Sequence, residues 1–298
     1  MNAVRGSGAW NTAAPAGTAG GDDAAMTELA STGTRPGVAQ AAARLDAAAR
    51  TRRPCSPVRD LIAADDVDAA YAVQQVLVEA RIAAGARVVG RKIGLTSEAV
   101  QRQLGVDRPD FGVLFDDMRY RQDETIPLDR LLQPKVEAEI AFVLGTDLAD
   151  GELDAARVRA AVAHAVPALE IVDSRVAGWD ISFADTVADN ASSGLFVLGE
   201  DTVPLSEVEP AQTGMTMTIG ETVVSTGSGA ACLGDPLNAL KWLAVTAREF
   251  GRPLRAGQVV LSGALGPMVP VEPGSVVTAR ITGLGTVTAR FGATLEES

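Results

Sequence analysis

Two segments near the start of the chain carry apolar residues at helical spacing. Alanine, leucine and valine recur three and four positions apart from about Val38 to Arg52, and again from Asp66 to Ala84. This period places them along one face of a helix, so each segment predicts an amphipathic helix. Asp65 or Asp66 is a suitable N-cap for the second helix, and Gly85 is a suitable end signal.

The last third of the chain consists of short apolar runs separated by Gly and Pro turns. One helix is predicted there, from Pro236 to Phe250. Strands are predicted at Met215–Thr226, Val259–Ser262, Val276–Ile281 and Thr286–Phe291. Helices followed by clustered strands predict an α+β fold whose core is a curled mixed sheet.

The pattern also predicts how the chain divides. Residues 1–35 are rich in Ala, Gly, Thr and Ser and show no sustained period, so we expect a disordered tail. Residues 36–105 are expected to form a mainly helical part. Residues 106–298 are expected to form a β-rich domain.

Two glutamates interrupt the apolar face of a predicted strand from Pro134 to Gly145. Alternate residues of a strand share a face, so Glu137 and Glu139 point the same way, followed by Ala141 and Val143. Two adjacent buried carboxylates repel each other and lose hydration, which a shared proton or a bound cation relieves. The alternative is an edge strand whose two glutamates face solvent.

A third glutamate lies inside another apolar run, from Ala165 to Arg175. A single charge within such a run is rarely left unpaired, so Glu170 is a candidate third metal ligand. Asp173 and Arg175 follow it as a candidate ion pair.

Composition narrows the chemistry and the partners. The chain has 298 residues, 47% of them hydrophobic, and a formal net charge of −12. Such a charge repels nucleic acid and anionic membranes, so neither is expected as a partner. No apolar run reaches the length of a membrane helix and the first residues do not have the order of a signal peptide, so a cytoplasmic protein is expected.

The metal-binding residue types are few. The chain has two cysteines, Cys55 and Cys232, in no ligand-spaced motif, and His164 is its single histidine. A thiolate or histidine-rich site is therefore disfavoured. Any metal must be held mainly by oxygen, which favours Mg²⁺ or Mn²⁺.

Three further polar positions lie at the ends of predicted strands or in loops. Lys92 lies between a strand end and two glycines, from where it could reach a pocket or simply face solvent. Asp110 lies at the start of a predicted short strand, where an aspartate by itself commonly forms a turn. Ser192 lies in a loop of small residues that could approach a substrate carboxylate, although ordinary helix ends use the same residues.

Five segments, in this order, together resemble one family. They are Gly90–Thr96, Pro109–Gly112, Pro134–Glu139, Leu169–Arg175 and Asp185–Ser192. The chain is similar through them to the 2-keto-4-pentenoate (2-hydroxypenta-2,4-dienoate) hydratase family of the fumarylacetoacetate hydrolase superfamily. The resemblance extends from about Val38 to the C-terminus.

The resemblance implies a mixed β-roll with a helical N-terminal part, a divalent metal, and a small 2-oxo or 2-hydroxydienoate substrate from aromatic or steroid ring degradation. It implies Glu137, Glu139 and Glu170 as metal ligands, so that residues 106–298 are the metal-binding catalytic domain, and Lys92, Asp110 and Ser192 as catalytic or substrate-contacting residues. It also implies a homo-oligomer that could dock another enzyme of the pathway. One departure is Asp235, which adds a negative charge where the family is expected to have His-Pro or Asn-Pro.

Three alternatives to the hydratase remain open at this point. A decarboxylase of 4-oxalocrotonate-type 2-oxo-3-enedioates would need the same metal site. An acylpyruvate-type hydrolase would use a histidine to activate water, but His164 is not in the N-terminal part where that residue is expected. A non-catalytic assembly partner would not need all three glutamates and Lys92.

Overall fold

The computed structural model describes residues 35–97, 101 and 106–293. Residues 1–34 of the predicted tail lie outside the described residues. Residues 35–298 group as one unit by their contacts. The division of this unit near residue 105 stays a prediction.

The two helices predicted at the start are present, and their residues explain their bounds. The first begins at Pro36, whose missing N–H costs nothing at a helix start, and it buries Val38, Ala41, Ala42, Leu45 and Ala48. The second begins after Asp66, whose side chain accepts a hydrogen bond from the Ala69 N–H at 2.9 Å. The α-helices are α2 (Pro36–Thr51), α3 (Val67–Ala83), α5 (Ala155–Ala161), α6 (Phe183–Ala188) and α7 (Pro236–Glu249).

The strands form two sheets, one eight-stranded and one five-stranded. The first has the order β2-β1-β10-β5-β6-β7-β3 with β11 paired to β5, and the second has the order β4-β13-β12-β8-β9. Strands of the first are β1 (Val88–Gly94), β2 (Asp110–Phe115), β3 (Arg119–Tyr120), β5 (Lys135–Leu144), β6 (Val162–Val172), β7 (Ser193–Leu198), β10 (Val259–Ala264) and β11 (Val269–Pro270). Strands of the second are β4 (Thr125–Ile126), β8 (Gly214–Ile219), β9 (Thr222–Ser228), β12 (Val276–Ile281) and β13 (Gly285–Phe291).

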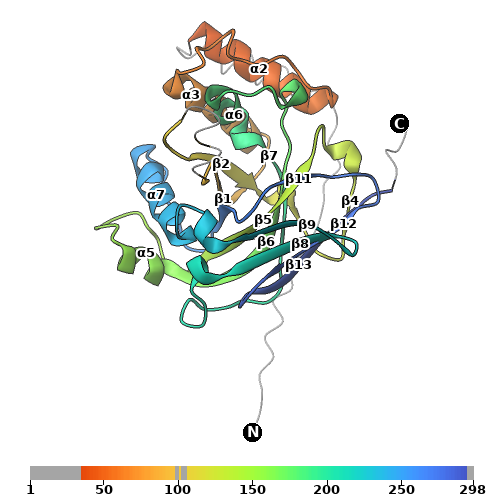
Figure 1. Cartoon of the computed structure of the whole chain (residues 1–298). Helices are drawn as coiled ribbons and strands as arrows, with labels where there is room; N and C mark the ends of the chain where they lie inside the picture. The colour runs from red at the N-terminus through yellow and green to blue at the C-terminus, as the bar shows by residue number, and fades with distance from the viewer. Residues whose placement is uncertain (1–34, 98–100, 102–105, 294–298) are drawn as a thin grey trace. The chain divides into compact units, whose positions relative to one another are not determined.

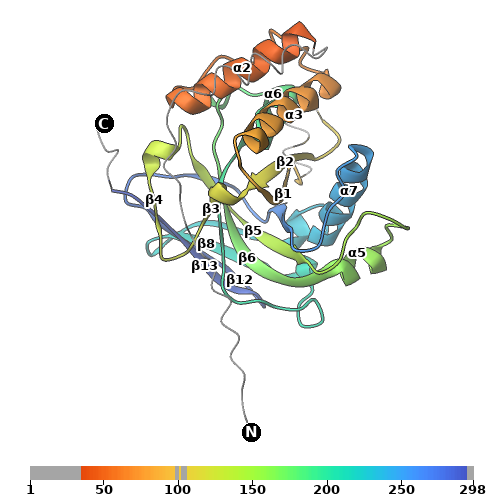
Figure 2. The same ribbon diagram turned by 180° about the vertical axis from the view of Figure 1, so that it is seen from behind.

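Strands β5 and β6 lie at the centre of the first sheet. The second sheet packs beside them, with β12 and β13 contacting β6. Helices α2, α3 and α6 lie together at the end where β1 and β2 are found, and α7 packs on β10 (Figures 1 and 2). The β5–β6 pair is therefore covered by other elements, and its side chains are largely buried.

The predicted strand from Met215 to Thr226 is instead a hairpin. Strand β8 ends at Ile219 and β9 begins at Thr222, with an antiparallel register between them. Gly220 has a φ of 57°, a left-handed conformation that suits glycine and lets the chain reverse. In the sequence, Gly220 and Glu221 are the two residues that interrupt the apolar pattern at this turn.

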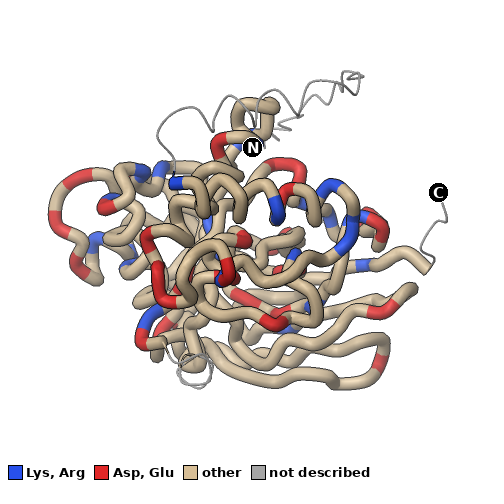
Figure 3. The backbone as a smooth tube through the Cα atoms, turned by 90° about the horizontal axis from the view of Figure 1, so that it is seen from above, with Lys and Arg blue, Asp and Glu red and all other residues tan. Residues whose placement is uncertain are grey.

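Charged residues are unevenly distributed. They lie mainly along the helices and connecting loops, whereas the strands of the second sheet carry few (Figure 3). Among the described residues, no helix is both long and apolar enough to cross a membrane.

Candidate active site

The register of β5 and β6 brings three glutamates together. Glu137 on β5 pairs directly with Glu170 on β6, and Glu139 lies two residues further along the same face of β5. One carboxylate oxygen from each of the three lies within 4.8 Å of the other two. We call these three residues the carboxylate cluster.

The carboxylate cluster is buried but poorly hydrogen-bonded. Glu139 and Glu170 have 0% and 1% of their surface exposed, while Glu137 is partly buried. Glu139 Oε2 accepts a hydrogen bond from the Gly263 N–H at 2.7 Å, but Oε1 and both oxygens of Glu170 have no hydrogen-bond partner. Buried oxygens without donors are a suitable ligand set for a hard divalent cation, so the residues present fit a metal.

Burial and mutual repulsion disfavour the charged forms of these groups. Loss of hydration, with the charge of Glu170, raises the pKa of Glu137 to about 7. The same causes, together with the charge of Glu137, raise the pKa of Glu139 well above its usual range. A bound cation would relieve this repulsion, because it favours the ionised carboxylates.

Lys92 reaches the carboxylate cluster from β1. Its Nζ lies 3.2 Å from Glu170 Oε1, without the alignment of a hydrogen bond, and donates to the Ala191 carbonyl at 2.9 Å. Burial alone would lower the pKa of Lys92, but the charges of Glu170 and Asp110 outweigh it and raise that pKa. The lysine therefore stays an ammonium ion at the edge of the cluster. It does not face solvent, which the sequence had left open.

Asp110 lies beside Lys92 on the neighbouring strand. It pairs with Gly94 in the β1–β2 register, and a Cβ at that glycine would lie only 2.2 Å from Asp110 Oδ1. The glycine therefore leaves room for this carboxylate. Burial, reinforced by the charge of Glu170 and opposed by that of Lys92, raises the pKa of Asp110 to about 6.

Ser192 lies near these residues but makes a different contact. Its hydroxyl is 3.2 Å from the Thr186 hydroxyl, and no hydrogen bond joins it to the carboxylate cluster. The short 3₁₀ helix Asn190–Ser192 that contains it has positive φ values at all three residues. This left-handed turn directs the Ala191 carbonyl to Lys92.

The sequence did not indicate the residues that hold this turn. The Asn190 side chain bonds both the N–H and the carbonyl of Val113 on β2, at 2.8 and 2.9 Å. Arg175 forms an ion pair with Asp189, and not with Asp173 as expected from proximity in the chain. In the sequence, the Asp189-Asn190 pair before small residues indicates this turn, because Asn and Asp tolerate a left-handed backbone.

Asp173 and Asp235 have structural contacts. Both oxygens of Asp173 accept the Leu132 N–H, at 3.0 and 2.9 Å, and Oδ1 also accepts the Gln133 N–H at 2.6 Å. Asp235 is the N-cap of α7 and accepts the Leu237 N–H at 2.9 Å. A helix N-terminus favours a negative side chain, so capping accounts for the departure at this position.

Two of the cavities lined by described residues lie away from the carboxylate cluster. One, of about 40 Å³, lies among α3, β1, β2 and the end of α7, and is lined by residues including Arg91 and Phe111. The other, of about 510 Å³, is lined by residues including Arg119, His164 and Glu200. Neither is lined by the three glutamates, so the site is identified by its chemistry and not by cavity size.

Comparison with known proteins places this arrangement in a family. The model of the fumarylacetoacetate (FAA) hydrolase C-terminal family matches residues 78–292. A "TodF product hydratase" of Pseudomonas putida F1 is 55% identical over 266 residues, covering 89% of this chain and 99% of that protein. A 2-keto-4-pentenoate hydratase of Paraburkholderia xenovorans is 54% identical over 252 residues, covering 85% and 94%. The chain belongs to the 2-keto-4-pentenoate hydratase family of the fumarylacetoacetate hydrolase superfamily.

A solved structure of the superfamily is similar over the same region. The 4-oxalocrotonate decarboxylase of Pseudomonas putida G7, complexed with magnesium and adipate, has a TM-score of 0.83 and 35% identity, covering 87% of this chain and 99% of that one. The predicted α+β fold of the fumarylacetoacetate hydrolase type is thereby confirmed. The family prediction made from the five sequence segments is confirmed as well.

Proposed function

We propose that this protein is a hydro-lyase that adds water to 2-hydroxypenta-2,4-dienoate, as its 2-oxopent-4-enoate form, to give 4-hydroxy-2-oxopentanoate. One observation supports the proposal most: the buried carboxylate cluster, in which Glu139 Oε1 and both oxygens of Glu170 lack a hydrogen-bond partner, lies beside Lys92, in a chain 54% identical to a 2-keto-4-pentenoate hydratase. A further relative, from Comamonas testosteroni, is a 2-hydroxyhexa-2,4-dienoate hydratase with 40% identity.

The metal in this proposal is Mg²⁺ or Mn²⁺, held by Glu137, Glu139 and Glu170. Oxygen ligands suit both ions, and related structures contain magnesium or manganese. When bound, the ion supplies a Lewis acid that can accept the carboxylate and keto oxygens of a 2-oxo acid and stabilise enolate charge.

Hydration requires proton transfers that the neighbouring residues could perform. Starting from the dienol, protons must reach C5 and C3, the enol hydroxyl at C2 must lose its proton, and the water that adds its oxygen to C4 must lose one. Asp110, with a pKa raised to about 6, can both accept and release a proton near neutral pH. The Lys92 ammonium, buried between Glu170 and the Ala191 carbonyl, can donate hydrogen bonds and balance negative charge.

Ser192 is proposed as a substrate-contacting residue. Ser192 is buried, and the hydrogen bond described for its hydroxyl is with the Thr186 hydroxyl, so the hydroxyl could turn to a substrate oxygen. The homo-oligomer, the cytoplasmic location and docking of another pathway enzyme stay predictions.

The second candidate is a decarboxylase of 4-oxalocrotonate type. It is favoured by the structural similarity to the Pseudomonas putida G7 enzyme, although the identity of 35% is below the 54% shared with the Paraburkholderia hydratase. Both reactions develop enolate charge that a bound cation would stabilise, so the metal site alone does not separate them.

An absorbance assay separates the two candidates. The protein is incubated with Mg²⁺ and 2-hydroxypenta-2,4-dienoate, and loss of the dienol absorbance is followed. Rapid loss, with 4-hydroxy-2-oxopentanoate as the product, is expected. Turnover of oxalocrotonate with release of CO₂, but none of the dienoate, would replace the hydratase with the decarboxylase.

A further inference from the structure

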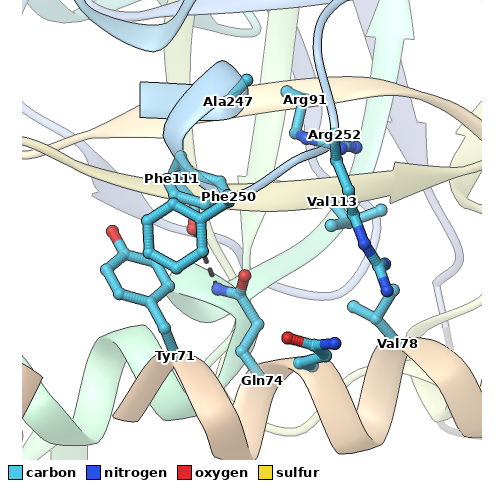
Figure 4. A pocket seen from close by; sticks show the side chains of 10 residues that line it. Tyr71, Gln74, Val78, Arg91, Phe111, Val113, Ala247, Phe250 and Arg252 are labelled. Carbon is cyan, nitrogen blue, oxygen red and sulfur yellow. Dashed lines mark hydrogen bonds between the residues drawn. The ribbon is translucent and has the colours of Figure 1, made fainter. Parts of the chain in front are cut away.

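The smaller cavity lies behind the strands that carry Lys92 and Asp110. Figure 4 shows side chains from α3, from the β1–β2 pair and from the end of α7 around it. Its volume of about 40 Å³ exceeds the roughly 10–15 Å³ that one water needs, so it has room for a few heavy atoms. Its lining is Tyr71, Gln74, Gln75, Val78, Arg91, Phe111, Val113, Ala247, Phe250 and Arg252.

Arg91 is a buried cation in this lining. Only 6% of its surface is exposed, and its Nε has no hydrogen-bond partner. The single hydrogen bond described for it is a long one, 3.4 Å from Nη1 to the Gly90 carbonyl. Within the described residues Arg91 has no carboxylate partner, although buried arginines normally have one.

The charges around the cavity do not neutralise Arg91. Arg252, the second cation of the lining, is already paired with Glu79 through a contact of 2.8 Å, and Gln75 donates to the same Glu79 oxygen. Burial, with a smaller contribution from Arg252, lowers the pKa of Arg91 to about 10, so it still carries its charge at neutral pH. The cavity therefore has excess positive charge beside a buried guanidinium.

The remaining walls are apolar and aromatic. Phe111 stacks on Tyr71 with ring centroids 4.8 Å apart, and Phe250 lies edge-on to Phe111 at 5.5 Å. The Gln74 amide donates to the Phe111 carbonyl at 2.9 Å, which fixes this wall (Figure 4). A ligand here would meet a guanidinium on one side and aromatic rings on the other.

This site is separate from the carboxylate cluster. Arg91 pairs with Val113 and Ile93 with Phe111, whereas Lys92 pairs with Gly112. Directly opposed residues of an antiparallel pair share a face, and neighbours in sequence face opposite ways. The cavity and the active site therefore lie on opposite faces of the same two strands.

We propose that this cavity holds a carboxylate group bound to Arg91, with a short apolar end against Phe111 and Phe250. A guanidinium binds a carboxylate through two parallel hydrogen bonds, which would supply the missing partner of the Arg91 Nε. The carboxylate could come from a small monocarboxylic acid or from an Asp or Glu side chain of a second copy of the chain. The site is independent of the proposed reaction.

Thermal unfolding with acetate as the probe tests the small-acid source. Acetate is compared with a bulky sulfonate buffer ion at equal ionic strength, in the wild type and in Arg91→Met. A saturable rise in Tm is expected for the wild type, with at least about tenfold weaker binding in the variant, because it loses a charge-assisted pair. Arg280→Met, which removes an exposed arginine of β12, is the matched control and should bind acetate like the wild type.

Sedimentation of the same proteins tests the second source. If a second copy supplies the carboxylate, wild type will not respond to acetate, and Arg91→Met will dissociate while Arg280→Met stays associated. If Arg91→Met does not fold, both measurements are repeated with Arg252→Gln. This variant is a milder change because Arg252 lies at the more exposed side of the cavity. The proposal is wrong if neither acetate binding nor association differs between the cavity variants and the control.

Discussion

Two groups of buried carboxylates in this protein have opposite surroundings. Asp185 accepts hydrogen bonds from the Val58, Arg59 and Ser182 N–H groups, and its charge is paired with the Arg59 guanidinium at 2.9 Å. In Glu170, which is equally buried, neither oxygen has a hydrogen-bond partner.

Asp189 resembles Asp185 in this respect. It accepts the Arg175 N–H at 2.9 Å and forms an ion pair with the Arg175 guanidinium. A carboxylate with its lone pairs occupied can stabilise a loop but has little capacity to bind a ligand. The comparison therefore separates structural aspartates from the carboxylate cluster by their hydrogen bonds, although burial alone would group them together.

Removing charge from the cluster should have the largest effect on function. In the double variant Glu137→Gln, Glu139→Gln we expect metal binding to be lost and turnover to fall by at least about 1,000-fold, because two of three anionic ligands are gone. The fold should persist, since the variant also removes repulsion between buried charges. Isothermal titration with Mn²⁺ and the dienol assay measure the two losses.

The matched control is Glu221→Gln, which neutralises an exposed glutamate in the β8–β9 turn. It should bind metal and turn over substrate like the wild type. Activity of the double variant at saturating metal would contradict the ligand assignment.

Removing a structural aspartate should instead reduce stability. Asp189→Asn leaves Arg175, of whose side chain 13% is exposed, without its anionic partner. We expect a loss of about 3 kcal/mol in the free energy of unfolding, as for other broken buried pairs. Urea unfolding measures it.

Metal binding should be retained in Asp189→Asn, since its proposed ligands lie on β5 and β6 and not on this loop. Loss of metal affinity with unchanged stability would contradict the structural role of Asp189 and would indicate that it takes part in metal binding.

The smallest expected effect is a dependence of stability on pH that metal removes. The pKa of Glu137 is raised to about 7 in the folded protein, so between its ordinary value and about 7 the folded state holds more protons than the unfolded state. The metal-free protein should therefore lose stability as pH rises through this window. Unfolding from about pH 5 to pH 8, with and without Mg²⁺, measures the change.

Bound metal should flatten this profile, because it stabilises the ionised carboxylates. Asp189, whose pKa burial raises to about 6 against the charge of Arg175, contributes in the same direction but should do so equally with and without metal. A metal-free profile that rises through this window would contradict the proposed repulsion within the cluster.

Much of the fold followed from local pattern. Apolar spacing predicted α2, α3, α7 and most strands, because each period reflects which side chains a helix or strand can bury together. It did not predict the β8–β9 hairpin, since apolar spacing alone does not show that the chain reverses at Gly220, where the backbone is left-handed.

The sequence by itself determined that Glu137 and Glu139 share a face, since a strand alternates its side chains, and that a metal here would have oxygen ligands. Only the tertiary structure decided which carboxylates meet. The pairing of β5 with β6 sets Glu170 opposite Glu137, and strand β1 brings Lys92 within 3.2 Å of Glu170. Those distances depend on hydrogen bonds between strands that are far apart in the sequence. The same tertiary structure places no hydrogen-bond donor on the Glu170 oxygens but places the Val58 N–H on Asp185.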